Sequence, residues 1–131
     1  MGYESKFYAC RDYGFKYPDE KYNASEIVAS LAVSKMGYSG TVTEFLNLFS
    51  IETPFGIYLP DYDEETEMEK MMYVHEDKYG APLCYLNDID EAITLAMQMY
   101  NEDKYWRFKL LIKFLEAFKD EEDIYIVHYG Y

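Results

Sequence analysis

Alternating apolar and polar positions at the two ends of the chain predict strands. Residues 4–17 indicate a hairpin, because the apolar stretches 7–10 and 15–17 flank a turn at residues 12–14. At the other end, residues 124–129 are rich in β-branched and aromatic side chains, which is typical of a strand. Pairing of the first and last strands would complete one antiparallel sheet.

Between these ends, apolar side chains recur every three to four residues, and a capping signature precedes the first such segment. Asn23 followed by Glu26 has the spacing in which a polar side chain at a helix start bonds the backbone and a carboxylate bonds back. Gly37 supplies a C-terminal stop. The sequence therefore predicts a helix over residues 23–37. Its apolar face contains Ile27, Val28 and Leu31.

The same signature recurs twice. Thr41 with Glu44 precedes the apolar residues 45–49, which favours a short helix and leaves a strand as the alternative. Asp88 with Glu91 precedes a regular amphipathic stripe and predicts a longer helix. The stripe consists of Ile89, Ala92, Ile93, Ala96, Met97 and Tyr100.

The segment between these two helices permits two interpretations. Residues 57–59 predict a short strand that Pro60 ends. Beyond it, Met68, Met71, Met72 and His75 have helical spacing after an acidic start. The alternative is a strand over residues 71–75 that pairs with residues 83–86.

After residue 103 the chain is again strongly helical, with apolar side chains on two faces. One face contains Phe108, Leu111, Ile112, Leu115 and Phe118, and the other contains Trp106, Leu110, Phe114 and Ala117. Apolar residues on two faces predict a central helix that is covered on more than one side.

Together these elements predict an α+β fold. The N-terminal hairpin and the C-terminal strand form a small antiparallel sheet, and three to four helices cover one face of it. A chain of 131 residues can bury a substantial core, so we expect residues 1–131 to form a single domain. Cys10 and Cys84 are far apart in sequence and predict reduced core thiols rather than a disulfide framework.

The number and position of the acidic residues indicate what kind of partner the protein binds. The chain contains 25 Asp and Glu against 12 Lys and Arg, a net charge of −13, and −11 of this lies from Asp61 onward. Between Asp61 and Glu69, six of nine positions are acidic. This negative charge repels nucleic-acid phosphates and anionic membranes, so we expect the protein to bind neither of them directly. A basic protein surface is the partner that the charge favours. With neither a signal-like leader nor a membrane span, we expect a cytoplasmic protein.

The acidic run also invites comparison with a calcium-binding loop. Asp61, Asp63 and Glu65 supply the alternate carboxylates of such a loop. The match then ends, because Thr66 stands where the loop needs Gly and Met72 stands where it needs Glu. We therefore predict no metal site here.

The two histidines are the remaining candidates for a catalytic or metal-binding site. His75 and His128 lack a second His or Cys at metal-ligand spacing, and the chain has no nucleophile elbow, phosphate-binding loop or dinucleotide fingerprint. We therefore predict no catalytic residue and no cofactor. The alternative is a small enzyme or ligand-binding domain whose site is assembled from dispersed His and carboxylate residues.

Sixteen tyrosines favour binding, since Tyr is enriched at interfaces. In composition, size and interleaving of Tyr with Asp and Glu, the chain resembles the small inhibitors that phages and mobile elements use against host restriction or CRISPR nucleases. The resemblance covers general character rather than a motif. It implies an inhibitor that occupies a DNA- or RNA-binding groove and uses no cofactor.

The leading hypothesis is thus an acidic, protein-binding nucleic-acid mimic. Its predicted contact surface consists of Asp61, Tyr62, Asp63, Glu64, Glu65, Glu67, Glu69, Asp120, Glu121, Glu122, Asp123 and Tyr125. This hypothesis requires the carboxylates to lie on one face of the folded chain. The abundance of apolar and aromatic residues is also compatible with a homodimer.

Overall fold

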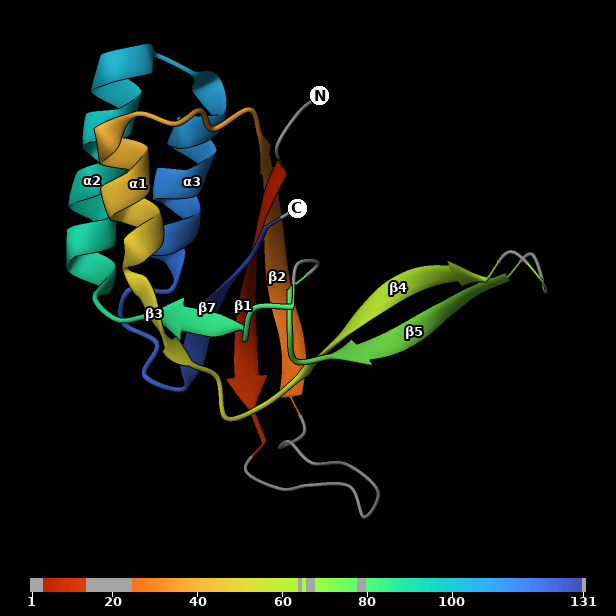
Figure 1. The fold of residues 1–131 in the computed structure, drawn as a ribbon. Coiled ribbons are helices and arrows are strands. Elements are labelled where there is room, and N and C mark those ends of the chain that lie inside the picture. Colours follow the sequence, from red (N-terminus) through yellow and green to blue (C-terminus); the bar gives the residue numbers. More distant parts are fainter. Residues whose placement is uncertain (1–3, 14–24, 64, 66–67, 78–79, 131) are drawn as a thin grey trace.

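Figure 1 shows the fold in a computed structural model, which describes residues 4–13, 25–63, 65, 68–77 and 80–130. This part of the chain contains seven strands and three helices. They are β1 (Glu4–Asp12), β2 (Ser25–Ser34), α1 (Gly40–Asn47), β3 (Phe49–Glu52), β4 (Ile57–Asp63), β5 (Met68–Val74), β6 (Cys84–Leu86), α2 (Ile89–Asp103), α3 (Trp106–Ala117) and β7 (Ile124–Gly130). The predicted mixture of helices with an antiparallel sheet is confirmed.

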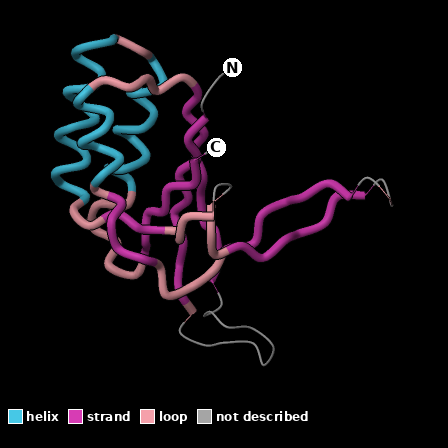
Figure 2. Tube along the Cα trace, viewed as in Figure 1, coloured by secondary structure: helices cyan, strands magenta, loops and turns pink. Residues whose placement is uncertain are grey.

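The main sheet has five strands in the order β2-β1-β7-β6-β3, all paired antiparallel. β1 lies between β2 and β7, so that Phe7 is opposite Leu31 on one side and His128 on the other. The predicted pairing of the N-terminal and C-terminal strands is therefore confirmed. The sheet is larger than predicted because β3 and β6 also join it. All three helices cover one face, as Figures 1 and 2 show.

The prediction of a helix over residues 23–37 is wrong, because Ser25–Ser34 forms strand β2. Along this strand Glu26, Val28 and Ser30 are exposed while the residues between them are more covered. This period of two fits a strand, and pairing along the full length of β1 outweighs the local helical signal. The predicted hairpin partner at residues 15–17 lies outside the described residues.

The two other capping signatures both lead to helices. α1 begins after Ser39, whose hydroxyl accepts a hydrogen bond from the backbone N–H of Val42 (3.2 Å), so its cap lies two residues before Thr41. α2 begins after Asp88, whose carboxylate accepts a hydrogen bond from the backbone N–H of Glu91 (3.1 Å), as predicted. In the described part of the chain, no helix has the length and apolar character needed to cross a membrane.

The prediction that the last helix is covered on more than one side is wrong. In α3, Phe108 and Leu111 are fully buried, whereas Trp106 is 57% exposed and Leu110 is 38% exposed. The helices form a single layer on the sheet (Figure 1), so only one face of α3 meets the core.

β4 and β5 form a separate two-stranded sheet, here called the arm, which extends away from the main sheet (Figures 1 and 2). The segment at residues 71–75 is thus mainly strand rather than helix. Its main partner is β4 rather than residues 83–86. The latter two segments meet only at their ends, where the backbone N–H of Leu83 donates a hydrogen bond to the carbonyl of His75 (3.1 Å) beside a bridge between Glu76 and Pro82. Pro60 lies inside β4 instead of ending it. An arm strand has one neighbour, so Pro is tolerated where its missing N–H would face away from that neighbour.

Each face of the main sheet contacts its own apolar cluster. The helix-side cluster includes Phe7, Phe45 and Phe108, and the arm-side cluster consists of Tyr8, Cys10, Phe55, Ile57, Leu83 and Val127. Neighbouring residues of β1 alternate between the two clusters, as expected for a strand. Cys10 is a buried free thiol, as predicted, and its burial raises its pKa to about 12. Cys84 is also free but is only half-buried.

Candidate binding site

The arm is attached to the rest of the molecule around Gly56. The backbone N–H of Gly56 donates a hydrogen bond to the Tyr73 hydroxyl (3.0 Å), and its carbonyl accepts one from the Ser25 hydroxyl. A side chain at Gly56 would collide with Tyr73, because an added Cβ would lie 2.4 Å from the ring carbon Cζ. Ile57 is fully buried, and Tyr58 packs on Tyr73 with ring centroids 4.9 Å apart. These contacts fix the root of the arm.

Five predicted contact residues lie in the outer part of the arm, and the stretch of sequence 61–69 is here called the arm end. They are Asp61, Tyr62 and Asp63 at the end of β4, Glu65 in the turn and Glu69 in β5, whereas Glu64 and Glu67 lie outside the described residues. Tyr62 is opposite Glu69 in the strand register. The acidic run of the sequence therefore belongs to the part of the arm remote from the main sheet (Figure 1).

The five other predicted contact residues lie where α3 leads into β7. They are Tyr125 and four exposed acids, here called the corner: Asp120, Glu121, Glu122 and Asp123. Asp123 forms an ion pair with Arg11 (3.1 Å). Tyr125 is half-buried and packs edge-on against Tyr85 and Phe55, with centroids 4.9 and 5.6 Å away. Figure 1 places this region at the foot of the helices, far from the arm end, so the structure does not bring the two groups together.

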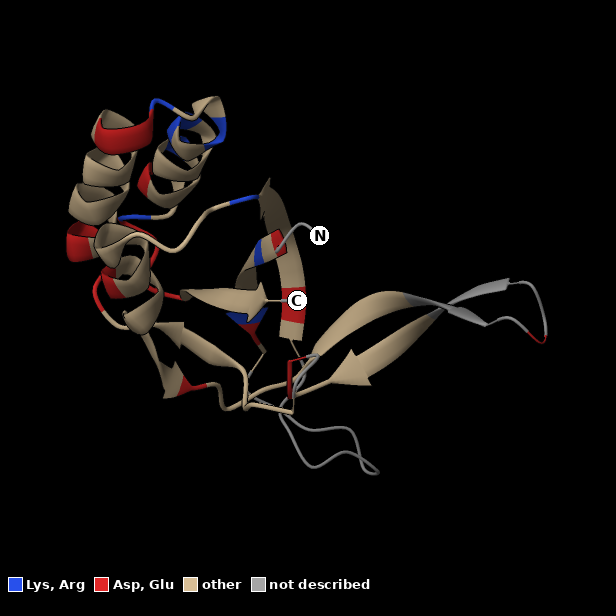
Figure 3. Ribbon diagram, turned by 45° about the horizontal axis from the view of Figure 1, so that its top comes forward, with Lys and Arg blue, Asp and Glu red and all other residues tan. Residues whose placement is uncertain are grey.

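Basic residues of the second half gather around α3 (Figure 3). Five of the seven that follow residue 60 are Lys104, Arg107, Lys109, Lys113 and Lys119. The ammonium groups of Lys104 and Lys109 lie 5.1 and 5.3 Å from the centroid of the Tyr100 ring. The arm end contains no basic residue in its sequence. The arm end and α3 therefore carry opposite net charge.

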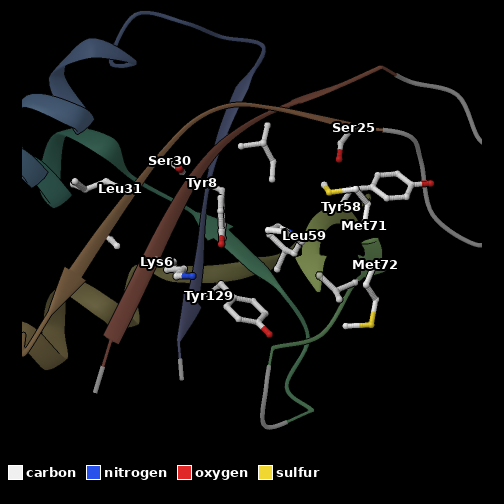
Figure 4. A pocket seen from close by; sticks show the side chains of 14 residues that line it. Lys6, Tyr8, Ser25, Ser30, Leu31, Tyr58, Leu59, Met71, Met72 and Tyr129 are labelled. Carbon is white, nitrogen blue, oxygen red and sulfur yellow. The ribbon is translucent and has the colours of Figure 1, made fainter. Parts of the chain in front are cut away.

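A cleft of about 770 Å³ lies between the arm side of the main sheet and the arm (Figure 4). Prominent side chains are Lys6, Tyr8 and Tyr129 from the sheet and Tyr58, Met71 and Met72 from the arm. Among the described residues that line the cleft, Lys6 is the only one with an ionised side chain at neutral pH. This apolar, tyrosine-rich cavity with a few polar groups has the character of a ligand site.

The sequence-based site does not include this cleft, although part of its signal is visible. Lys6 and Tyr8 alternate along the first predicted strand, and Tyr125 and Tyr129 occupy alternate positions in the last one. A second, aromatic face of the sheet follows from that spacing. The opposite wall cannot be inferred in this way, because it depends on where the arm folds.

A serine and a histidine lie together on the helix side. Ser5 Oγ and His128 Nε2 are 2.9 Å apart, and the imidazole ring packs between Phe7 and Phe49 with centroids 5.1 and 5.6 Å away. Burial lowers the pKa of His128 to about 4, against an opposing effect of Asp77. Ser5 is fully buried, and neither residue lines the cleft. The pair thus resembles a nucleophile and base in its distance only, and a substrate has no access to it.

The other histidine is exposed. His75 Nε2 lies 4.0 Å from the carboxylate of Glu76, its neighbour in sequence. Within the described residues, no group of three or more His, Cys, Asp or Glu side chains is placed to hold a metal ion.

Comparison with known proteins leaves the function open. No protein-family model matches the chain, and no curated protein or solved structure matches it either. The arm, the cleft and the distribution of charge are therefore the features that bear on function.

Proposed function

We propose that this chain is an acidic protein-binding inhibitor whose arm enters a cationic groove of its partner. One observation carries the proposal: the run between Asp61 and Glu69, with six acids in nine positions, belongs to the far end of a projecting arm. A narrow two-stranded element can enter a groove that a broad surface cannot. The anchored root around Gly56 supports this role, since it limits the freedom that the arm would lose on binding.

The sign of the charge on the arm end supports mimicry of a nucleic acid. Strand residues rise by about 3.3 Å each, so the three register pairs from Asp61 to Asp63 cover about 10 Å. These pairs contain the acids Asp61, Asp63 and Glu69 and the base Lys70, which is opposite Asp61. The excess of acids gives the arm end the negative charge of a nucleic acid, at a lower density than the one charge per about 1.7 Å of duplex DNA.

A nuclease is the partner that best fits such an element, because its nucleic-acid groove presents lysines and arginines to phosphates. The resemblance to small phage and mobile-element inhibitors supports a host nuclease of a restriction or CRISPR system, with the cytoplasm as the place of action. Occupation of the groove would block the nuclease by competition, without a cofactor. The corner would add a secondary contact at most, since it lies far from the arm end.

Charge reversal on the arm tests this proposal against the corner as a matched control. The arm variant carries Asp61→Lys, Asp63→Lys and Glu65→Lys, and the corner variant carries Asp120→Lys, Glu121→Lys and Glu122→Lys. Both change the net charge by the same amount. Each protein is immobilised and exposed to bacterial lysate, captured proteins are identified, and duplex DNA and single-stranded RNA are added as competitors.

We expect the wild type and the corner variant to capture a nuclease that DNA or RNA displaces, and the arm variant to lose it. Capture should also weaken steeply as salt is raised, because exposed ion pairs are screened. Equal capture by the arm variant would contradict the proposal, and so would a partner that nucleic acid does not displace.

A second candidate function, ligand binding, is favoured by the cleft. The ligand-binding domain considered from the sequence has a site of His and carboxylate residues. Neither type occurs among the described residues that line the cleft. A ligand there would have to be recognised by different chemistry.

A further inference from the structure

We propose that the cleft binds a long-chain carboxylate, a ligand with an apolar body and one anionic head. This inference does not depend on the inhibitor function, because the cleft lies at the inner part of the arm and the acidic run belongs to its end. It rests on the volume, the lining and the single charge of the cleft.

The volume and walls suit an apolar body. About 770 Å³ falls within the range of roughly 300–1,000 Å³ that is usual for small-molecule sites. Ile27, Leu59 and Val74 line it together with Met71 and Met72. The two methionines are 59% and 45% exposed, and their flexible side chains can adapt to an alkyl chain.

The main sheet forms one wall of this site, and its strand pairing holds that wall in place. Tyr8 is 7% exposed in β1, which is paired with a strand on each side. Lys6 lies on the same face of β1 and is directly opposite Ala32 in β2 and Tyr129 in β7. The head-group end of the site is therefore held on a strand that is paired on both sides.

The charge of the lining selects the head group. The chain contains 25 acidic residues, yet none is among the described residues that line the cleft, where Lys6 supplies the single ionised group. A carboxylate there would gain a charge-assisted hydrogen bond from one of the three N–H donors of the ammonium group. A cationic head would be repelled by the Lys6 ammonium group.

Figure 4 indicates the direction in which the ligand would lie. Lys6 and Tyr129 are at one side of the cleft, and Met71 and Met72 are at the other. The carboxylate would contact Lys6, and the alkyl chain would extend between the sheet and the arm towards the methionines.

Calorimetric titration with two surfactants of opposite charge tests this inference. Dodecanoate and dodecyltrimethylammonium have the same chain length and are used below their micelle concentrations. We expect the wild-type chain to bind dodecanoate at least about tenfold more tightly, as a charge-assisted hydrogen bond implies. No binding of dodecanoate, or equal binding of both, would overturn the inference.

Two lysine variants separate the local contact from net charge. Lys6→Met keeps the aliphatic stem, and Lys113→Met removes the same charge from an exposed site on α3. Lys6→Met should weaken dodecanoate binding about tenfold, whereas Lys113→Met should leave it within about twofold. Equal effects would reject Lys6 as the head-group contact.

A third variant tests the cleft without altering charge. Ser30 is exposed and lines the cleft, so Ser30→Trp should fill part of it and abolish dodecanoate binding. Circular dichroism shows whether each variant retains the fold. Undiminished binding by folded Ser30→Trp would place the ligand elsewhere and overturn the inference. Arm-end charge reversal tests the inhibitor proposal separately, so the two can fail independently.

Discussion

The two faces of the main sheet are covered in different ways. On the helix side, Phe7, Phe45 and Phe108 are fully buried beneath three helices. On the arm side, the cluster around Phe55 and Ile57 leaves room for a cleft lined by tyrosines, serines and one lysine. The difference indicates a division of roles. Close packing on the helix side stabilises the fold, and incomplete coverage on the arm side leaves a surface for binding.

Removal of one large side chain from each face gives the largest predicted effect. Phe108→Ala should lower the free energy of unfolding by about 3–5 kcal/mol, because it leaves a cavity at a fully buried site. Met72→Ala should lower it by less than about 1 kcal/mol, since Met72 is 45% exposed in the cleft. Urea denaturation measures both, and similar losses would contradict the proposed division of roles.

A smaller effect is expected at the root of the arm. Gly56→Ala should cost about 1–3 kcal/mol of unfolding free energy, because the new methyl group collides with the Tyr73 ring. Gly40→Ala is the matched control. Nothing lies within 4 Å of its added Cβ, so the substitution should be neutral or stabilise α1 by up to about 1 kcal/mol. Equal stability of the two variants in urea would show that the arm root is not tightly packed.

The smallest predicted effect is a pH dependence that originates on the helix side. The folded pKa of His128 is about 4 against 6.5 ordinarily, so the unfolded chain binds an additional proton between these values. The contribution of neutral His128 to the free energy of unfolding is therefore greatest above pH 6.5 and is lost as the pH falls towards about 4. From pH 6.5 to about pH 5 we expect the free energy of unfolding to fall by about 1.5 kcal/mol because of this group.

The control for this pH dependence is His128→Gln, which has no titrating group at that position. Urea denaturation of both proteins over the same pH interval should give a shallower dependence for the variant. Identical pH dependence would show that His128 is not the group responsible.

Elements specified by neighbouring residues could be predicted from the sequence. For α2, Asp88, Glu91 and the apolar stripe all act within one segment, and the helix forms as predicted. Elements that depend on distant partners were harder to predict. Residues 25–34 carry both helical and strand spacing, and only pairing with β1 decides between them. The apolar outer face of α3 is ambiguous for the same reason, since its burial depends on how many layers cover the helix.

The candidate site shows the same limit. The sequence reveals the charge at Asp61 and Asp120 but not that the arm end and the corner lie at different ends of the molecule. The cleft joins Lys6 to Met71 and Met72 across a long stretch of chain. Chemical character is local information, whereas convergence of side chains is a property of the fold.

Strand β1 has a consequence for the time course of folding. Ser5 pairs with Gly130, so β1 cannot gain its second neighbouring strand until residues 124–130 have left the ribosome. At roughly 5–20 residues per second, synthesis of the intervening chain takes about 6–25 seconds. During that interval β2 is the one strand with which β1 can pair. Rapid pairing of these two strands would protect the nascent chain from aggregation.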